Sequence, residues 1–206
     1  MARPAYDELK RKGIEAEIRA HALRLFARSG YRNVSLRAIA AEMRWSATAL
    51  YRYYSSKEML LDAIRAEGFM YMREVLASVR TQSSNPLQAA ANAMQAYVRF
   101  AGEQSVLYQL MYELDQSEIE ISSQVSENRR LAFAEAIKIA ESISAQEKAS
   151  MDTVEMAHLF WIAAHGLAAL SVAHQLDLGK GLADLVNPAV STLLRGLRAD
   201  SIEGRS

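Results

Sequence analysis

The sequence predicts an all-α protein, with an N-terminal three-helix helix-turn-helix domain followed by a C-terminal helical bundle. Apolar residues recur at helical spacing through most of the 206 residues, and no run alternates strictly as a half-buried strand does. Only 3 Pro and 9 Gly are present, which argues against a turn-rich β fold. Half of the residues are hydrophobic, so a chain of this length can bury a substantial core.

The first 54 residues predict three short helices. The apolar stripe of the first helix ends near Phe26, and Gly30 then suits the left-handed position that follows a helix. Ser35 and Ser46 each precede a short apolar-periodic segment, where a side-chain oxygen can cap the free N–H groups. Two capped helices therefore follow the first.

The second and third predicted helices form a helix-turn-helix. They cover about residues 36–42 and 47–53, and the tight turn Met43-Arg44-Trp45 joins them. Small side chains at the start of the third helix allow close approach to base edges, and hydroxyls and Arg reach phosphates or guanine. An ordinary helical hairpin with its tyrosines in the core is the alternative. The side chains expected to face outward are Ala47, Thr48, Ala49, Tyr51, Arg52 and Tyr53.

The remaining helices follow from capping residues and linkers. Ser55-Ser56-Lys57-Glu58 is a capping box that predicts a long helix to about Val79. Thr81 to Pro86 is a linker, and Pro86 suits the first turn of the next helix. Pro188 either kinks the last helix or marks its start. The later helices are expected near 87–101, 103–114, 118–142, 151–176 and 183–197.

Charge divides the chain although its total is neutral. Residues 1–57 hold 12 basic and 5 acidic side chains, a balance of +7, and the remainder carries −7. A basic head suits a polyanion such as DNA, and the acidic body then has another role. We therefore expect a DNA-binding head at 1–57, with a connecting helix to about 79, and a separate body at 80–206.

Composition also excludes several classes of protein. The absence of cysteine excludes a disulfide scaffold and a thiolate metal site, and it suits a cytoplasmic location. The N-terminus lacks the apolar core of a secretory signal. The stretch 156–176 has no Asp, Glu, Lys or Arg and is long enough to span a bilayer, but it contains three His. We expect it to be a buried helix of a soluble protein, with no membrane partner.

Several stretches resemble the DNA-binding domain of the TetR family over about residues 12–62, without a gap. The resemblance implies a transcriptional regulator, usually a repressor, that binds a palindromic operator as a homodimer. It also implies an all-helical C-terminal domain that binds a small-molecule effector. The matching residues are Leu25-Phe26, Gly30-Tyr31, Val34 to Ala40, Ser46, Leu50 to Tyr54 and Lys57 to Leu60.

The resemblance assigns roles to individual positions. It implies that Ser35 and Arg37 hold phosphates from one side, and Tyr51 and Lys57 from the other. Arg44 stands where the family usually has Gly, so we expect a left-handed residue strained by about 1–2 kcal/mol. The family also differs at two of the base-facing positions, so its base preference does not transfer. The residues expected to face bases or adjacent backbone are Ala47, Thr48, Ala49, Arg52 and Tyr53.

The C-terminal half resembles the helical domain called WHG, through Trp161, His165 and Gly166. His158, Trp161 and His165 lie at i, i+3 and i+7, on one helix face. They line a ligand cavity, or else His165 is a core histidine with its hydrogen bonds satisfied. The candidate ligand-binding residues are Tyr108, Met111, Tyr112, His158, Trp161 and His165.

The last two predicted helices, about 151–176 and 183–197, are apolar on more than one face. Two copies of such a pair can form a four-helix bundle across a two-fold axis, which predicts a homodimer.

Two alternatives stay open. The first is a helical small-molecule-binding protein whose head has lost specific DNA binding. The second is an all-α metal-binding enzyme that uses His158, His165 and nearby carboxylates. The chain has no Gly-rich phosphate loop, Ser-His-Asp arrangement or His-Glu-x-x-His motif. We therefore predict no enzyme activity, and no catalytic residues, metal ligands or cofactor.

Overall fold

The computed structural model describes residues 3–112, 122–149, 151–176 and 179–203, and within these ranges it contains helices and no strand. The predicted all-α class is confirmed. The elements are α1 (Arg3–Ser29), η1 (Tyr31–Asn33), α2 (Leu36–Glu42), α3 (Ala47–Tyr51), α4 (Lys57–Gln82), α5 (Pro86–Glu103), α6 (Ser105–Met111), α7 (Ser123–Glu147), α8 (Thr153–Val172) and α9 (Leu182–Glu203).

The helix-turn-helix begins at the predicted caps. Ser35 Oγ accepts a hydrogen bond from Ala38 N, and Ser46 Oγ accepts one from Ala49 N, each at 3.2 Å. α3 ends two residues earlier than expected, at Tyr51. The prediction that all three helices are short is wrong for α1, which has 27 residues.

The core of the head is assembled from α1, α2, α3 and the start of α4. Ile18, Ile39 and Leu50 are fully buried in one apolar cluster, which also includes Leu60. Leu110 of α6 belongs to the same cluster, although it lies far along the chain. The body is therefore anchored to the head by apolar packing as well as by chain connection.

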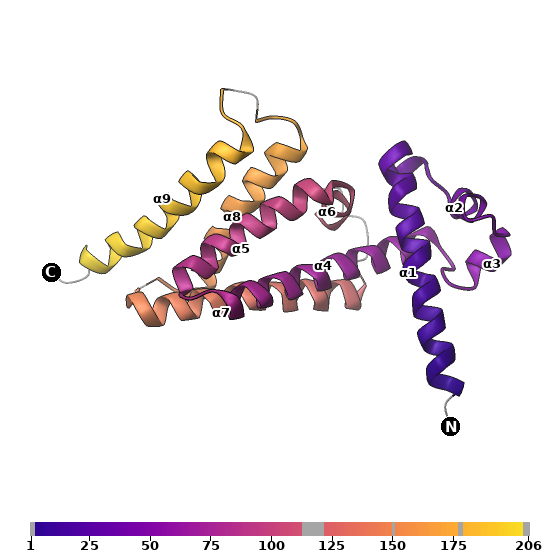
Figure 1. Ribbon diagram of the computed structural model, residues 1–206, viewed down its shortest axis with the longest axis horizontal. Helices are drawn as coiled ribbons and strands as arrows, with labels where there is room; N and C mark the ends of the chain where they lie inside the picture. Colours follow the sequence, from indigo (N-terminus) through magenta and orange to yellow (C-terminus); the bar gives the residue numbers. More distant parts are fainter. Residues whose placement is uncertain (1–2, 113–121, 150, 177–178, 204–206) are drawn as a thin grey trace.

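α4 leaves the head and runs the length of the body beside α7, with α5, α8 and α9 stacked over this pair (Figure 1). Its N-cap is Ser56, whose Oγ accepts from Met59 N, rather than Ser55 as the predicted capping box requires. Asn85 caps α5, and Pro86 occupies its first turn as predicted.

Several later helix ends differ from the prediction. α6 is shorter than 103–114, and residues 113–114 lie outside the described part. α7 continues to Glu147 because its buried stripe extends to Ile143; its predicted start, 118–121, lies outside the described residues. α9 begins at Leu182 and contains Pro188 inside the helix, so the proline does not mark its start.

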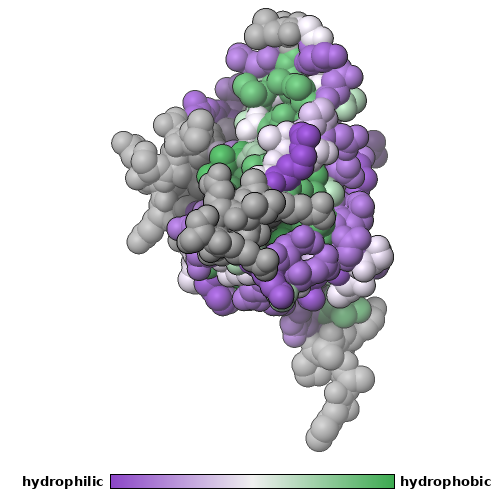
Figure 2. All heavy atoms as spheres, turned by 90° about the vertical axis from the view of Figure 1, so that its left-hand side faces the viewer, coloured by the Kyte–Doolittle hydropathy of each residue, from purple (hydrophilic) through white to green (hydrophobic). Residues whose placement is uncertain are grey.

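α8 is not the buried helix that its composition predicts. Among the described helices it is the one long and apolar enough to cross a membrane, but only 22% of that window is buried. One face, with Ala157, Ala164 and Ala168, packs into the body. Large apolar side chains cover another face and stay exposed, including Leu159, Ile162 and Leu170. None of the described residues covers that face. Apolar surface is also visible at the end of the molecule that α8 and α9 occupy (Figure 2).

Arg44 in the turn has a φ of 57°, the left-handed conformation expected from the missing glycine. Replacing Arg44 with Gly relieves that strain but gives the unfolded chain more freedom. We expect Arg44→Gly to raise the free energy of unfolding by about 0.5–1 kcal/mol in urea denaturation. Arg44→Ala is the control, because it removes the side chain but keeps the strained backbone. Equal stability of the two variants would contradict the prediction.

Candidate nucleic-acid interface and ligand cavity

The outward face of α3 carries three of the predicted DNA-facing side chains. Thr48, Tyr51 and Arg52 are exposed, and Ala47 and Ala49 beside them are half-buried. Small residues at the start of α3 thus leave its N-terminal end open to close approach.

Tyr53, which follows the end of α3, differs from the exposed Tyr51 and Arg52. Its ring is half-buried, lies 6.0 Å from the Trp45 ring between centroids, and is covered by the Arg11 guanidinium at 5.8 Å. Tyr54 is buried and accepts a hydrogen bond from Arg19 at 2.9 Å. Of the two tyrosines expected to face outward, Tyr51 is exposed as predicted, whereas Tyr53 is partly in the core.

Three of the four predicted phosphate contacts, Ser35, Tyr51 and Lys57, line one hollow of about 450 Å³. Arg37 is exposed on α2 outside its lining. Hydroxyl and ammonium donors that converge on one hollow suit a phosphate. The hollow is lined by Arg32, Asn33, Val34, Ser35, Leu36, Tyr51, Ser55, Ser56 and Lys57.

Lys57 is held at the edge of this hollow. Its Nζ donates to the backbone oxygen of Arg32 at 3.3 Å and lies 5.7 Å from the centre of the Tyr31 ring. Burial lowers the pKa of Lys57, because the charged ammonium loses part of its hydration. A bound phosphate would stabilise the charged ammonium of Lys57 in place of the lost hydration.

The acidic side chains of the head are largely occupied by ion pairs. Glu8, Glu15 and Glu42 bind Lys12, Arg11 and Arg28, at 2.9, 2.8 and 2.5 Å. In contrast, Arg37 and Arg52 have no ion-pair or hydrogen-bond partner among the described residues. Arg37 and Arg52 therefore leave positive charge on the solvent-exposed face formed by α2 and the residue that follows α3.

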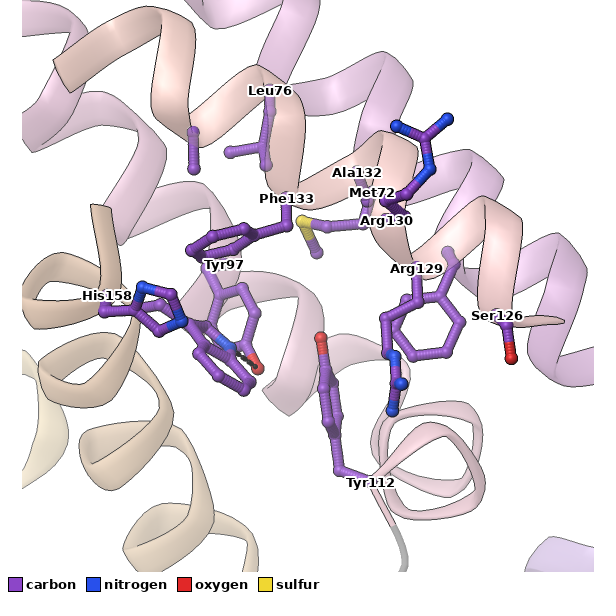
Figure 3. Close-up of a pocket in the computed structure, with 13 residues that line it drawn as sticks. Met72, Leu76, Tyr97, Tyr112, Ser126, Arg129, Arg130, Ala132, Phe133 and His158 are labelled. Carbon is purple, nitrogen blue, oxygen red and sulfur yellow. Dashed lines mark hydrogen bonds between the residues drawn. The ribbon is translucent and has the colours of Figure 1, made fainter. Parts of the chain in front are cut away.

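A cavity of about 520 Å³ lies in the body, between α4, α7 and α8 (Figure 3). Tyr112, His158 and Trp161 of the predicted ligand-binding set line it. Met111 instead lies in the core, where it packs against Gly68. The lining residues are Phe69, Met72, Leu76, Tyr97, Tyr112, Ser126, Arg129, Arg130, Ala132, Phe133, Ala136, His158 and Trp161.

Tyr108 and His165 belong to a polar cluster rather than to the lining of this cavity. The hydroxyls of Tyr97 and Tyr108 lie 2.9 and 3.0 Å from His165 Nδ1, and Trp161 Nε1 donates to the Tyr97 hydroxyl at 3.3 Å. Burial lowers the pKa of His165 and raises that of Tyr108 to about 12. His165 Nδ1 thus has two hydroxyl partners, and His165 also lines a second cleft together with residues of α6.

His158 is also satisfied within its own helix. Its Nδ1 lies 2.8 Å from the backbone oxygen of Val154, and its ring lies 4.5 Å from the Phe133 ring between centroids. Among the described residues, no group of three or more His, Asp or Glu is arranged to hold a metal ion.

Sequence reasoning missed most of the cavity wall. Phe69, Met72 and Leu76 of α4 lie at i, i+3 and i+7, and on α7 Arg129 and Phe133 lie at i and i+4. Each spacing marks a helix face, but neither indicates that the two faces meet across a cavity. Arg129, which lies among the apolar residues of this α7 face, is the one feature of the sequence that could have indicated a binding cavity.

Two family models match the chain. Residues 18–64 match "Bacterial regulatory proteins, tetR family", and residues 90–193 match "Tetracyclin repressor-like, C-terminal domain". The second match alone spans half of the chain and includes Trp161 and His165. The chain belongs to the TetR family. This TetR-family protein is a DNA-binding transcriptional regulator, and the family belongs to a class of regulators rather than of enzymes.

Solved structures of TetR-like fold resemble the chain over most of its length. A protein of unknown function from Rhodococcus sp. RHA1 is 26% identical, with a TM-score of 0.80, covering 89% of this chain and 95% of that one. A bacterial regulatory protein in the tetR family from Rhodococcus RHA1 is 23% identical, with a TM-score of 0.70 and coverage of 89% and 96%. The fatty acid degradation regulator FadR from Bacillus halodurans is 17% identical, with a TM-score of 0.74 and the same coverage. No curated protein matches this TetR-family sequence.

The half-buried His165 predicts a pH dependence of stability for this TetR-family regulator. Its folded pKa lies below the ordinary 6.5, so the unfolded chain takes up the proton first as pH falls. We expect the free energy of unfolding to decrease as pH is lowered through about 6.5, measured by urea denaturation between pH 7.5 and about 5.5. His165→Gln keeps an acceptor for the tyrosines and should flatten this decrease. The exposed His174, changed to Gln, is the control; an equal effect of both variants would refute the assignment.

Proposed function

We propose that this TetR-family regulator is a cytoplasmic, ligand-responsive repressor that binds a palindromic operator as a homodimer and has no enzyme activity. Residues 1–57 serve as the DNA-binding unit and 80–206 as the ligand-binding and dimerisation unit. One observation carries the proposal: α4 begins with Lys57 in the hollow of the head and then forms a wall of the body cavity through Phe69, Met72 and Leu76.

DNA contacts divide into two kinds. Ser35, Arg37, Tyr51 and Lys57 bind phosphates and set the position of α3 in the major groove. The small side chains let α3 approach the bases closely, and Arg52 has its guanidinium free to bind guanine or a phosphate. The residues that face bases or adjacent backbone are Ala47, Thr48, Ala49, Arg52 and Tyr53.

Dimerisation uses α8 and α9, the helices expected from about 151–176 and 183–197. A single helix-turn-helix buries too little surface for tight specific binding, so two heads are needed. The exposed apolar face of α8 supports this pairing, because Ile162 is 60% exposed and Leu159 and Leu170 lie exposed on the same helix. A two-fold dimer would set the recognition helices about 34–36 Å apart, in successive major grooves.

The cavity communicates with the head through contacts to α4. Arg65 of α4, 2% exposed, donates from Nε to the backbone oxygen of Leu110 at 2.9 Å, at the end of α6. Asp62 Oδ2 accepts from Ser122 N at 3.3 Å, just before α7. These bonds fix the end of α6 and the start of α7 to the same two turns of α4.

Close packing strengthens that attachment. A Cβ added to Gly68 would lie 2.5 Å from Met111 Sδ, so glycine at this position lets α6 press against α4. A ligand that separates α7 or α8 from α4 therefore displaces α4, and the two heads move with it. The ligand changes DNA affinity only to the extent that it binds one of the two arrangements better.

Lys57 provides the test of DNA binding. The operator is first selected from a random DNA pool, and its affinity is then measured against salt concentration by fluorescence anisotropy. We expect Lys57→Gln to weaken binding to all sequences alike and, because the dimer loses one phosphate contact in each head, to reduce the slope of log affinity against log salt by about 2.

Lys148→Gln is the matched control, because Lys148 is exposed at the end of α7 far from the head. The phosphate role of Lys57 would be abandoned if both variants kept the native slope. Selection of no sequence from the pool, with an affinity insensitive to salt, would favour a helical binding protein that has lost specific DNA binding.

Ile162 provides the test of the dimer. Replacing this exposed apolar side chain with Glu places a charge, and its symmetry mate, in the proposed interface. We expect Ile162→Glu to shift the chain from dimer to monomer in sedimentation velocity at micromolar concentration, and to weaken operator binding at least about tenfold. Met70→Glu on α4, where Met70 is 47% exposed, is the control. A native chain that sediments as a monomer would refute the dimer.

A further inference from the structure

Among the described residues, one guanidinium in the lining of the body cavity, that of the exposed Arg129, has no ion-pair partner. Of the cavity's lining residues, only Arg129 and Arg130 are charged, and none of the described residues that line it is acidic. Arg130 binds Glu127 through two hydrogen bonds of 2.9 and 2.7 Å. Arg129 has no hydrogen-bond or ion-pair partner among the described residues.

The two arginines point in opposite directions. In Figure 3 the Arg130 guanidinium points away from the cavity, whereas the Arg129 side chain extends toward Tyr112. The hydroxyl of Tyr112 points into the cavity from the end of α6 (Figure 3). Arg129 and Tyr112 thus present a guanidinium and a hydroxyl to the same region.

Tyr112 is a donor rather than an anion. Burial raises its pKa, and this outweighs the opposing effects of hydrogen bonding with Tyr97 and Trp161 and of the Arg129 charge. The phenol therefore keeps its proton near neutral pH. A protonated hydroxyl beside an unpaired guanidinium is a pair of donors suited to the two oxygens of a carboxylate.

Most of the remaining lining of the cavity is apolar or aromatic. Phe69, Met72, Leu76 and Phe133 supply most of the wall, and a smaller void of about 60 Å³ adjoins it across Trp161. A water molecule occupies about 30 Å³ in the liquid, so the larger cavity, with a volume of about 520 Å³, has room for roughly 17 groups of that size. The cavity can therefore hold a ligand that has one charged end and an apolar remainder.

We propose that this cavity binds an amphipathic carboxylate, with the carboxylate on Arg129 and the Tyr112 hydroxyl and the apolar chain along α4 and α7. The proposal rests on the proposed ligand response and names the chemical class of the effector. A hydrophobic cation is disfavoured, because the cavity offers it Arg129 and no carboxylate from the described residues.

The ligand class is tested by calorimetric titration of the native full-length chain with three probes of equal chain length. These are decanoate, decanol and decyltrimethylammonium, each below its micelle-forming concentration. We expect decanoate to bind at least about tenfold tighter than decanol, because the anion makes charge-assisted bonds that the alcohol cannot make. Decyltrimethylammonium should bind weakest of the three.

Variants then locate the charged end. R129Q should remove the preference for decanoate over decanol, whereas R130Q, which removes the same charge one residue away, should keep it. R129K retains a positive charge and should keep part of the preference. Far-ultraviolet circular dichroism and thermal unfolding verify that each variant is folded.

Equal affinity for decanoate and decanol, tightest binding of the cation, no binding of any probe, or an R129Q variant with native preference would each overturn the proposal. The proposed function fails separately, because it is measured with operator DNA in the absence of any probe. A chain that selects an operator but shows no carboxylate preference loses only the ligand class. A chain that prefers decanoate but binds no DNA loses only the regulatory function.

Discussion

The arrangement of this protein depends on the packing of one continuous helix, α4, against two separate hydrophobic cores. Leu60 and Ile64 near its start belong to the core of the head, and Phe69 and Met72, only a few residues later, belong to the core of the body. A helix of 26 residues is about 39 Å long and is stiff on this scale. The two cores cannot shift relative to each other unless α4 moves against at least one of them.

The buried Arg65 and the half-buried Arg80 attach α4 to its neighbours on either side of the stretch that faces the cavity. Arg65 bonds to the end of α6, and Arg80 bonds to Glu135 of α7 at 3.1 Å. Burial tends to raise the pKa of Glu135, but hydrogen bonds from Lys138 and Arg80 outweigh it and lower that pKa, so the carboxylate stays charged. Breaking a buried pair is costly, and these pairs therefore fix the register of α4 against α6 and α7. The wall between them, from Phe69 to Leu76, is apolar and lies against the empty volume of the cavity.

Features that depend on residues within one helical turn can be predicted from the sequence. Contacts between helices that are far apart in the chain cannot. The starts of α2, α3 and α5 were predicted because each depends on a residue within the first turn of the helix. These residues are Ser35, Ser46 and Pro86. Periodicity identified the apolar face of α4 but not that α7 lies opposite, so Arg129 was not recognised as part of a cavity. Composition likewise cannot distinguish an apolar face that fills its own core from one that stays open, and α8 was expected to be buried for that reason. His165 was left open between two roles, and only the positions of Tyr97 and Tyr108 decide it.

In the proposed mechanism, the position of Lys57 in the first turn of α4 determines how a change in the body reaches DNA. Its ammonium is partly desolvated and oriented by the backbone oxygen of Arg32, so its fit to a phosphate depends on the distance between α4 and η1. A tilt of α4 changes that distance and, in a dimer, also changes the separation of two heads that must fit the same duplex. Coupling between two sites is typically worth about 1–3 kcal/mol, which corresponds to roughly 5–150-fold in affinity. Displacing one charge-assisted phosphate contact in each head is enough to supply a change of this size, since a hydrogen bond to a charged group contributes about 1.5–3 kcal/mol. The regulator therefore needs no large rearrangement, only a helix that is held firmly at both ends and bordered by a cavity between them.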